Sequence, residues 1–417
     1  MNNKPTVIQG GMGTGVSDWK LANAVSRAGQ LGVVSGTAID VIVVRRLQDG
    51  DEGGHVRRAL EQFPIKEVAQ RIIEKYYIPG GRDAGEKYRA KPILTHKQNK
   101  HLEELIVASN FVEVFLAKEG HDGIVGINFL EKIQLPTLPS IYGAMLAGVD
   151  YVLMGAGIPK AVPGYLDDFA AGKKVSQEIY VEGAEQDEHY CVSFDPNGFF
   201  GEAAPKLGRP RFLAIISSAT LASMLARKAS GKVDGFVVET STAGGHNAPP
   251  RGRMQLTAEG EPIYSKRDEA DLKAIAKLGL PFWVAGSCAN PSLVALAVNE
   301  GAEGIQAGTI FAYCEESGLR KDFKKRVLEI CKTSEPTVFT DPLASPTGFP
   351  FKVMQVPGTL SEDDVYCNRK RVCDLGYLRH AYKKEDGTLG WRCPAEPVAD
   401  YIKKGGNEHE TENRKCL

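Results

Sequence analysis

Val233-Asp-Gly-Phe-Val-Val-Glu-Thr-Ser-Thr-Ala-Gly-Gly-His246 is the stretch from which the fold prediction starts. Its first part, Val233–Val238, is short, apolar and rich in β-branched residues, which is typical of a buried strand. A polar residue, two adjacent glycines and a histidine follow. The glycines allow a ligand to approach the backbone closely, and histidine titrates near neutral pH. The stretch predicts either a binding loop at a strand end or a Gly-rich turn with an exposed histidine.

The same unit, a short apolar strand followed by a Gly-containing turn and a helical stretch, recurs along the chain. Alternating strands and helices predict parallel pairing, and eight units favour a closed α/β fold, the (β/α)8 TIM barrel. A doubly wound open sheet is the alternative. The eight candidate strands are Thr6–Gln9, Gly32–Ser35, Ile124–Asn128, Tyr151–Met154, Phe212–Ile216, Gly235–Glu239, Phe282–Ala285 and Gly304–Gln306.

Helix-like segments lie between these strands, and two of them carry recognisable start signals. Ser17 and Asn290 occupy expected N-cap positions, and Pro291 suits the first position of a helix. The segments are Asp18–Ala28, Pro139–Ala147, Ala219–Lys228 and Pro291–Asn299.

Three segments do not follow the repeat. Residues 41–110 are charged and partly helical, with a helix expected over Pro64–Tyr77 and an extra strand suggested by Phe111–Leu116. Residues 158–210 and 335–417 mix Pro, Gly and aromatic residues. We expect the barrel with its two insertions to span residues 1–334, and the C-terminal segment 335–417 to pack on it. Long excursions usually shape the binding mouth of a barrel.

Composition indicates an ordinary globular enzyme-sized chain. Hydrophobic residues make up 42% and charged residues 25%, and a net charge of −1 gives no reason to expect nucleic acid or an anionic membrane as partner. We expect no membrane span, no secretory segment and a cytoplasmic location with reduced thiols. A metal site is not expected, because the spacing of Cys367, Cys373, Cys393 and Cys416 fits no zinc signature.

In (β/α)8 barrels, phosphate often binds at the loops after the seventh and eighth strands. Here these loops contain Gly286-Ser287 and Gly308-Thr309, which combine backbone donors with hydroxyl groups. Each pair is expected where a helix starts. Alone, either is also an ordinary turn. Cys288, next to the first pair, is a conceivable nucleophile without an obvious base.

The first strand ends in Gln9-Gly-Gly-Met-Gly-Thr-Gly15, which lacks the third glycine of a Rossmann fingerprint in every register. It predicts a flat loop under a planar ring, with Met12 as a soft apolar contact, or a simple tight turn. Asn128, at the end of the third strand, offers an amide that both donates and accepts, or serves as a turn cap.

These motifs together resemble the nitronate monooxygenase (2-nitropropane dioxygenase) family and the related FMN-dependent enoyl-acyl-carrier-protein reductases. The resemblance covers residues 6–318, outside 41–110. It is carried by Gln9–Met12, Ser26–Gly32, Ala243-Gly-Gly-His246, and Gly301–Thr309 followed by Glu315-Glu-Ser317.

The resemblance implies a TIM barrel that holds FMN without a metal. Gly11 and Met12 would lie along the flavin ring, Asn128 at its polar edge, and Glu239, Gly244 and Gly245 beside it. The FMN phosphate would be held by Gly286, Ser287, Gly308 and Thr309. His246 falls on the family's catalytic histidine.

Departures from the family pattern leave the substrate open. Thr242 stands where the family usually has Glu, the strand-seven loop reads Gly286-Ser-Cys288, and Glu239 and Gly155-Ala-Gly157 are closer to the reductases. The leading expectation is an oxidation of alkyl nitronates with O₂ to carbonyl compounds and nitrite. The alternative is an NAD(P)H-dependent enoyl-thioester reductase acting in trans on a carrier protein. A flavin-binding protein without enzyme activity is a third reading, and a homodimer is left open.

Overall fold

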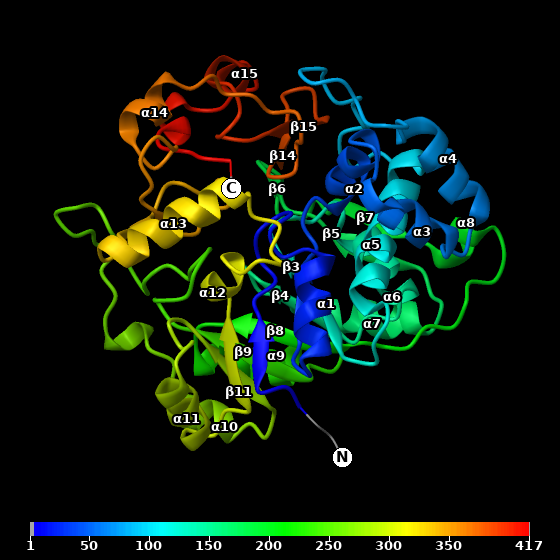
Figure 1. Cartoon of the computed structure of the whole chain (residues 1–417). Coiled ribbons are helices and arrows are strands. Elements are labelled where there is room, and N and C mark those ends of the chain that lie inside the picture. The colour runs from blue at the N-terminus through cyan, green and yellow to red at the C-terminus, as the bar shows by residue number, and fades with distance from the viewer. Residues whose placement is uncertain (1–3, 417) are drawn as a thin grey trace.

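The computed structural model describes residues 4–416 and has a parallel eight-stranded sheet at its centre, which confirms all eight predicted strands (Figure 1). Neighbouring strands follow the order β1-β11-β10-β9-β8-β4-β3-β2. The strands are β1 (Val7–Gln9), β2 (Gly32–Ser35), β3 (Val125–Leu130), β4 (Tyr151–Gly155), β8 (Arg211–Ile216), β9 (Gly235–Glu239), β10 (Phe282–Ala285) and β11 (Gly304–Ala307).

The sheet closes between its first two strands. Ile8 and Leu31 form a parallel bridge, and the backbone N–H of Gln9 donates to the carbonyl of Leu31 at 3.0 Å. The fully buried side chain of Gln9 completes the seam, because its Oε1 accepts from the backbone N–H of Val33 at 2.8 Å. The (β/α)8 barrel is therefore confirmed and the open sheet is wrong.

Side chains of the strands alternate between two apolar layers. Those pointing into the barrel form one buried cluster, and those pointing outward pack under the helices. Trp283 lies in the inner layer, where its Nε1 donates to the carbonyl of Pro5 at 2.8 Å. The inner layer consists of Ile8, Leu31, Val33, Tyr151, Leu153, Leu213, Ile215, Val237, Trp283 and Ala285.

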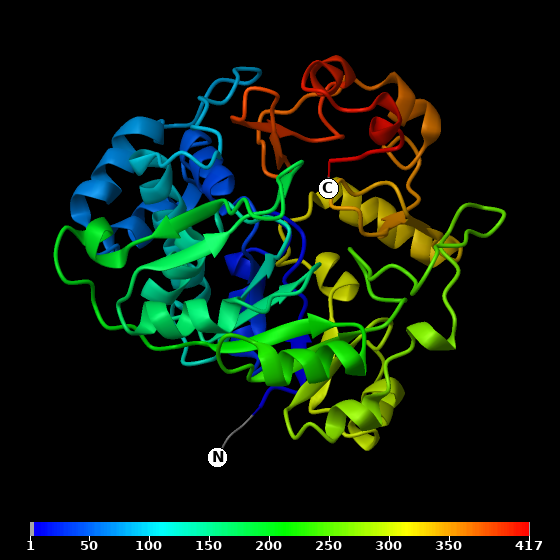
Figure 2. The same ribbon diagram turned by 180° about the vertical axis from the view of Figure 1, so that it is seen from behind.

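Helices surround the barrel (Figures 1 and 2). Those between successive strands are α1 (Trp19–Arg27), α6 (Thr137–Leu146), α7 (Val162–Ala170), α9 (Ala219–Lys228), α10 (Leu272–Ala276) and α11 (Pro291–Asn299). The helical insertion between β2 and β3 contains α2 (Ile39–Gln48), α3 (His55–Glu61), α4 (Lys66–Tyr76) and α5 (Lys100–Lys118). After β11 come α12 (Thr309–Ala312) and α13 (Lys321–Thr333). The helix predicted over Pro64–Tyr77 is confirmed as α4.

One of the two predicted N-caps is confirmed. Asn290 accepts from the backbone N–H of Ser292, and Pro291 is the first residue of α11. Ser17 was the wrong choice for α1, because Asp18 accepts from the first-turn backbone N–H groups. The Ser17 hydroxyl instead contacts the carbonyls of the loop after β1.

The strand suggested for Phe111–Leu116 is wrong, because these residues belong to α5. This helix packs against α1, α2, α3 and α6, so it is buried on nearly all sides. A helix buried all round needs no polar stripe, and its apolar run has the composition of a buried strand.

The two excursions that carry Pro, Gly and aromatic residues meet in space (Figure 2). Residue Val181 of the first pairs in parallel with Ala381 of the second. The first contains β5 (Val175–Glu178), β6 (Val181–Glu182), β7 (Cys191–Phe194) and α8 (Pro196–Phe200). The second contains β12 (Val338–Asp341), β13 (Phe351–Met354), α14 (Asp363–Asn368), β14 (His380–Lys383), β15 (Leu389–Arg392) and α15 (Val398–Lys403). Among residues 4–416, no helix combines the length and apolar character needed to cross a membrane.

The hydrogen bond from the Val33 N–H to the Gln9 side chain, where the barrel closes, leads to a prediction about stability. Replacing Gln9 with Leu leaves the buried N–H of Val33 without its partner, and an unsatisfied buried donor costs about 1–3 kcal/mol. We expect the thermal unfolding midpoint of Gln9→Leu to fall below that of wild type in differential scanning calorimetry. Gln70→Ala, at an exposed position of α4, serves as the control and should unfold like wild type. Equal midpoints for all three proteins would contradict the role of Gln9 in closure.

Candidate active site at the barrel mouth

The loops at the C-terminal ends of β1, β9, β10 and β11 lie against one another. The backbone N–H of Gly10 donates to the carbonyl of Ala307 at 2.7 Å, which joins the first and last loops. The N–H of Thr240 donates to the carbonyl of Ala285 at 2.9 Å, which joins the loops after β9 and β10. The predicted residues of these loops therefore lie at one mouth of the barrel.

Two glycines show how closely these loops approach. Gly286 has a φ of +121°, and a Cβ there would lie 2.0 Å from Oγ1 of Thr240. A Cβ on Gly244 would lie 2.8 Å from Oγ1 of Thr309. Because side chains larger than hydrogen would displace these hydroxyl groups, the loops after β9, β10 and β11 form one surface of backbone and hydroxyl groups.

A helix was expected to start at each of the pairs Gly286-Ser287 and Gly308-Thr309, and this is confirmed for the second pair alone. Gly308 is the N-cap of α12 and Thr309 its first residue. Ser287 has a left-handed φ of 51° and lies in the loop, because α11 begins only at Pro291.

The loop after β1 lies beside β2 and β3. A Cβ on Gly11 would lie 2.3 Å from Cγ1 of Val33 and 3.0 Å from Cβ of Asn128, so only glycine fits. The carbonyl of Met12 accepts from the Ser17 hydroxyl at 3.1 Å. This contact, with those of Gln9, orders the loop.

Buried polar atoms without partners lie at the end of β2 and within β3, which continues past Asn128 to Leu130, so Asn128 is not the last residue of its strand as expected. Asn128 is fully buried, and neither Oδ1 nor Nδ2 has a hydrogen-bond partner. Ser35, which pairs with Asn128 in register, has an unpaired hydroxyl. Buried polar groups in proteins are nearly always hydrogen-bonded, so these unpaired atoms leave hydrogen-bonding capacity for a ligand at this end of the barrel.

Glu239 ends β9 and carries a carboxyl group that is protonated at neutral pH. The residue is half-buried, and it lines a small pocket with Ser217, Thr240, Arg251 and Tyr264. Burial raises its pKa from 4.5 to about 8, because the enclosed group is poorly hydrated when charged. A protonated carboxyl both donates and accepts hydrogen bonds.

His246 lies between the barrel loops and the C-terminal segment. Its Nε2 lies 2.7 Å from the Ser345 hydroxyl, and its ring lies edge-on to that of Phe351 at a centroid distance of 4.8 Å. Nδ1 is buried without a partner. Burial lowers the pKa of His246 to about 4, so the imidazole is neutral at physiological pH.

The C-terminal segment holds Ser345 in place. Arg414 donates from its guanidinium to the carbonyls of Leu343 and Ser345, each at 2.7 Å. Lys415 pairs with Asp341 at 2.9 Å. Ser345 itself is fully buried. Sequence reasoning missed Ser345 and Phe351, since nothing in the Pro- and Gly-rich segment marks either residue as a neighbour of His246.

The cysteines show no sign of catalytic or metal-binding arrangement. The Cys288 thiol donates to the carbonyl of Gly286, and burial raises its pKa, which disfavours the thiolate that a nucleophile needs. Between residues 4 and 416, no group of three or more His, Cys, Asp or Glu side chains is arranged to hold a metal ion.

The raised pKa of Glu239 predicts how stability depends on pH. Between pH 4.5 and about 8 this carboxyl is ionised in the unfolded chain and protonated in the fold, so stability falls as pH rises through that window. His246 adds no slope above its ordinary pKa of 6.5. We therefore expect the unfolding midpoint of ligand-free protein to fall more steeply in wild type than in Glu239→Gln between about pH 6.5 and 8, measured by scanning fluorimetry. Glu202→Gln, at an exposed site, should follow wild type; parallel curves for all three would contradict the shift.

Comparisons with known proteins find partial likeness in solved structures alone. No family model matches the chain, and no curated protein matches it. FabK from Thermotoga maritima is 16% identical with a TM-score of 0.45, over 85% of this chain and 72% of that one. A nitroalkane oxidase from Streptomyces ansochromogenes is 14% identical with a TM-score of 0.40, over 84% and 77%. The enoyl reductase domain of MlnA from Bacillus amyloliquefaciens is 13% identical with a TM-score of 0.43, over 85% and 64%. Likeness at this level is no guide to chemistry, which rests on the side chains of the site.

Proposed function

We propose that this protein is an FMN-dependent oxidoreductase, and that it oxidises alkyl nitronates with O₂. The observation that carries the proposal is the fully buried amide of Asn128, which has no partner among the described residues. It lies against the Gly11 loop, at the mouth that also contains Glu239 and His246. An amide that donates and accepts, beside a glycine surface, suits the polar edge of a flat heterocycle.

The residues present fit FMN in both of its parts. Gly286, Ser287, Gly308 and Thr309 would hold the phosphate, since their loops offer backbone N–H and hydroxyl donors. Gly11 and Met12 would lie along the ring. Gly244, Gly245 and the protonated Glu239 would line it, and Asn128 would bond its polar edge.

His246 would face the substrate as a neutral hydrogen-bonding group. A general base works best with a pKa near the working pH, and a pKa of about 4 is far below it. The low pKa therefore favours orientation of the nitro group over removal of a proton from a neutral nitroalkane. With Nε2 engaged by Ser345, Nδ1 is the ring nitrogen that is left without a partner.

When bound, FMN would supply two-electron redox chemistry between the nitronate and O₂. The reaction would convert two nitronates and one O₂ into two carbonyl compounds and two nitrite ions, with one oxygen atom of O₂ in each carbonyl. A second candidate, the NAD(P)H-dependent reduction of an enoyl thioester, is favoured by Glu239 and by the turn Gly155-Ala-Gly157 after β4. Anaerobic stopped-flow mixing separates the two. Faster flavin bleaching by a nitronate supports the oxidation, and faster bleaching by NADH or NADPH supports the reductase.

The cofactor itself is the first prediction of this proposal. The purified protein should be yellow, and heat should release FMN and not FAD, because the two Gly-hydroxyl loops suit a single terminal phosphate. The released cofactor is identified by HPLC against both standards. Recovery of FAD, or of no flavin after reconstitution, would contradict the assignment of the site.

A second prediction concerns His246. The His246→Asn variant should keep FMN, because the adjoining glycines would hold it through the backbone. Turnover per bound flavin should fall about 100-fold or more, as for loss of one preorganised donor. The measurement is kcat normalised to flavin absorbance. If His246 were merely structural, flavin content or stability would fall while turnover per flavin stayed near normal.

Ser345 should act through His246 as a positioning residue. Ser345→Ala removes the partner of Nε2, so kcat should fall in the wild-type background. In the His246→Asn background the same change should have little further effect, because the two residues act as one unit. Equal effects in both backgrounds would contradict a role through His246. Ser176→Ala, at an exposed position of β5, is the control.

A further inference from the structure

The helix after the seventh barrel strand, α11, leaves most of its apolar side chains exposed. Its one buried residue is Ala297, whereas the side chains of Leu293, Leu296 and Val298 are 41%, 55% and 46% exposed. A barrel helix normally buries an apolar stripe against the strands and turns polar residues outward. Leu293 and Leu296 lie three residues apart and so share one side of the helix. The outer side of α11 is therefore an uncovered apolar face.

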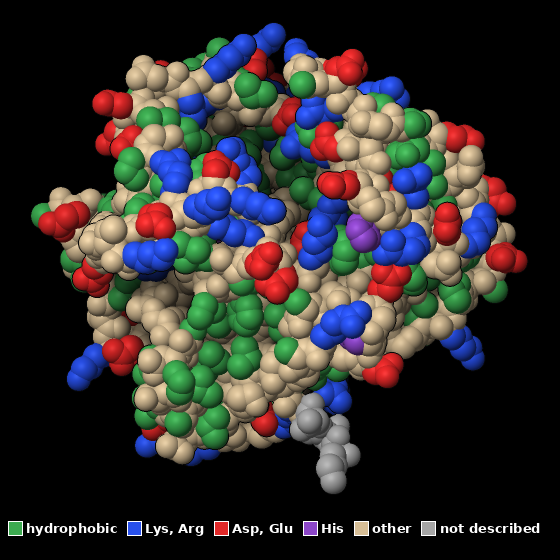
Figure 3. Space-filling model, viewed as in Figure 1, with side chains coloured by type: hydrophobic (Ala, Val, Ile, Leu, Met, Phe, Trp, Pro, Cys, Tyr) green, Lys and Arg blue, Asp and Glu red, His purple; other side chains and the backbone are tan. Residues whose placement is uncertain are grey.

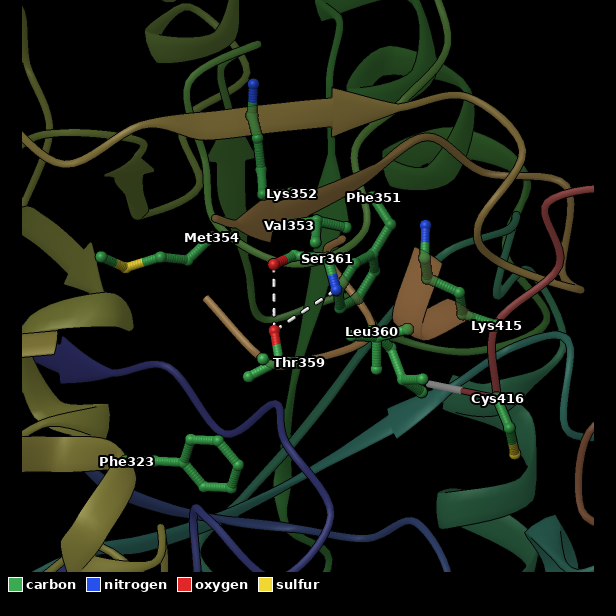
Figure 4. Close-up of a pocket in the computed structure, with 12 residues that line it drawn as sticks. Phe323, Phe351, Lys352, Val353, Met354, Thr359, Leu360, Ser361, Lys415 and Cys416 are labelled. Atoms are coloured by element: carbon green, nitrogen blue, oxygen red, sulfur yellow. Dashed lines mark hydrogen bonds between the residues drawn. The ribbon is translucent and has the colours of Figure 1, made fainter. Parts of the chain in front are cut away.

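The helix that normally stands beside it in the ring is short. A (β/α)8 barrel places a helix after its last strand, but α12 has only four residues. The longer α13 packs with the C-terminal segment instead. Phe323 of α13 lines a cavity of about 570 Å³ together with Phe351 and Leu360 (Figure 4), and the guanidinium of Arg326 donates to the carbonyl of Pro357. The position next to α11 is thus left to α12.

The surface that α11 and α12 form carries no charge. Asp, Glu, Lys and Arg are absent from residues 286–299 and from residues 304–314. The α11–α12 face, residues 289–299 and 310–314, is therefore neutral, and Ile310 adds to it a side chain that is 58% exposed. Figure 3 shows hydrophobic side chains gathered where Figure 1 places β11 and α11, with few charged ones among them. Contiguous apolar surface of this kind marks an interaction site.

We propose that the α11–α12 face binds the same face of a second copy of this chain. A charged partner gains no ion pair here, whereas two copies of a neutral face meet without like-charge repulsion. In a two-fold pair, α11 of each copy also supplies an apolar helix next to the α11 of the other. Residues 289–299 and 310–314 provide most of the roughly 20 residues that each partner contributes at the lower end of stable interfaces. The pairing is independent of the flavin chemistry.

Sedimentation equilibrium of the whole chain tests the pairing. Standard interfaces have micromolar or tighter dissociation constants, so wild type at about 100 μM should sediment with twice the mass of one chain. Leu296→Asp should raise the dissociation constant about 100-fold or more, because two carboxylates would face one another across the two-fold axis. Leu293→Asp is a second variant on the same face. Leu328→Asp, at a 44% exposed position of α13, should behave like wild type.

An exchange of charge tests whether α11 meets α11. Leu296→Asp and Leu296→Lys should each be monomeric, and mixing them should give a dimer with one copy of each, since opposite charges then face one another. A wild type that is monomeric at the stated concentration would show that another molecule covers the face, and would overturn the proposal. A dimer that survives both changes, or a mixture that does not pair, would overturn the contact of α11 with α11. None of these outcomes involves turnover, so the proposed function is tested separately.

Discussion

Closure of the barrel between β1 and β2 is the constraint on which the site depends, and the side chain of Gln9 is part of it. The two strands share a single bridge, and the Gln9 amide supplies the bond that the Val33 N–H would otherwise lack. The same amide donates to the carbonyl of Gly10 and so fixes the start of the loop on which a flavin would lie. On one side β1 already neighbours β11, β10 and β9 in the sheet. Its loop reaches Val33 and Asn128 on the other side because the sheet closes there.

Burial shifts the pKa values of Glu239 and His246, the two titratable groups discussed at the mouth, in opposite directions. The pKa of Glu239 is raised to about 8 and that of His246 is lowered to about 4, so both groups are neutral between these values. The cause is the same for both, since poor hydration disfavours whichever form is charged. Across the physiological range both side chains are therefore neutral groups that can form hydrogen bonds, and neither forms an ion pair there.

The sequence predicts the strands well because each is a short, mainly apolar run and most are followed closely by a glycine, a pattern that suits strands buried in a parallel barrel. The prediction of a strand at Phe111–Leu116 is wrong, because these residues belong to a helix that is buried on nearly all sides and so has the composition of a strand. The N-cap prediction also fails at Ser17, whose hydroxyl is drawn to the loop after β1, so that Asp18 caps the helix. The barrel positions of Gly11 and Glu239 follow from strand ends, and that of Asn128 from its place in β3 beside the end of β2. Ser345, Phe351 and the cavity beside them do not, because their approach to His246 depends on how a segment without a repeat folds back.

The fold-back of the C-terminal segment sets an order of events during synthesis. The last barrel strand ends at Ala307, whereas Arg414, which holds the Ser345 backbone, is made 107 residues later (414 − 307). At ribosomal rates this interval is roughly 5–20 s, long enough for a barrel to form. Ser345 and Phe351 are made 38 and 44 residues after Ala307 (345 − 307 and 351 − 307), so the barrel strands are complete before either neighbour of His246 exists. The contacts that Ser345 and Phe351 make with the His246 ring are therefore added to the barrel from chain made after its last strand.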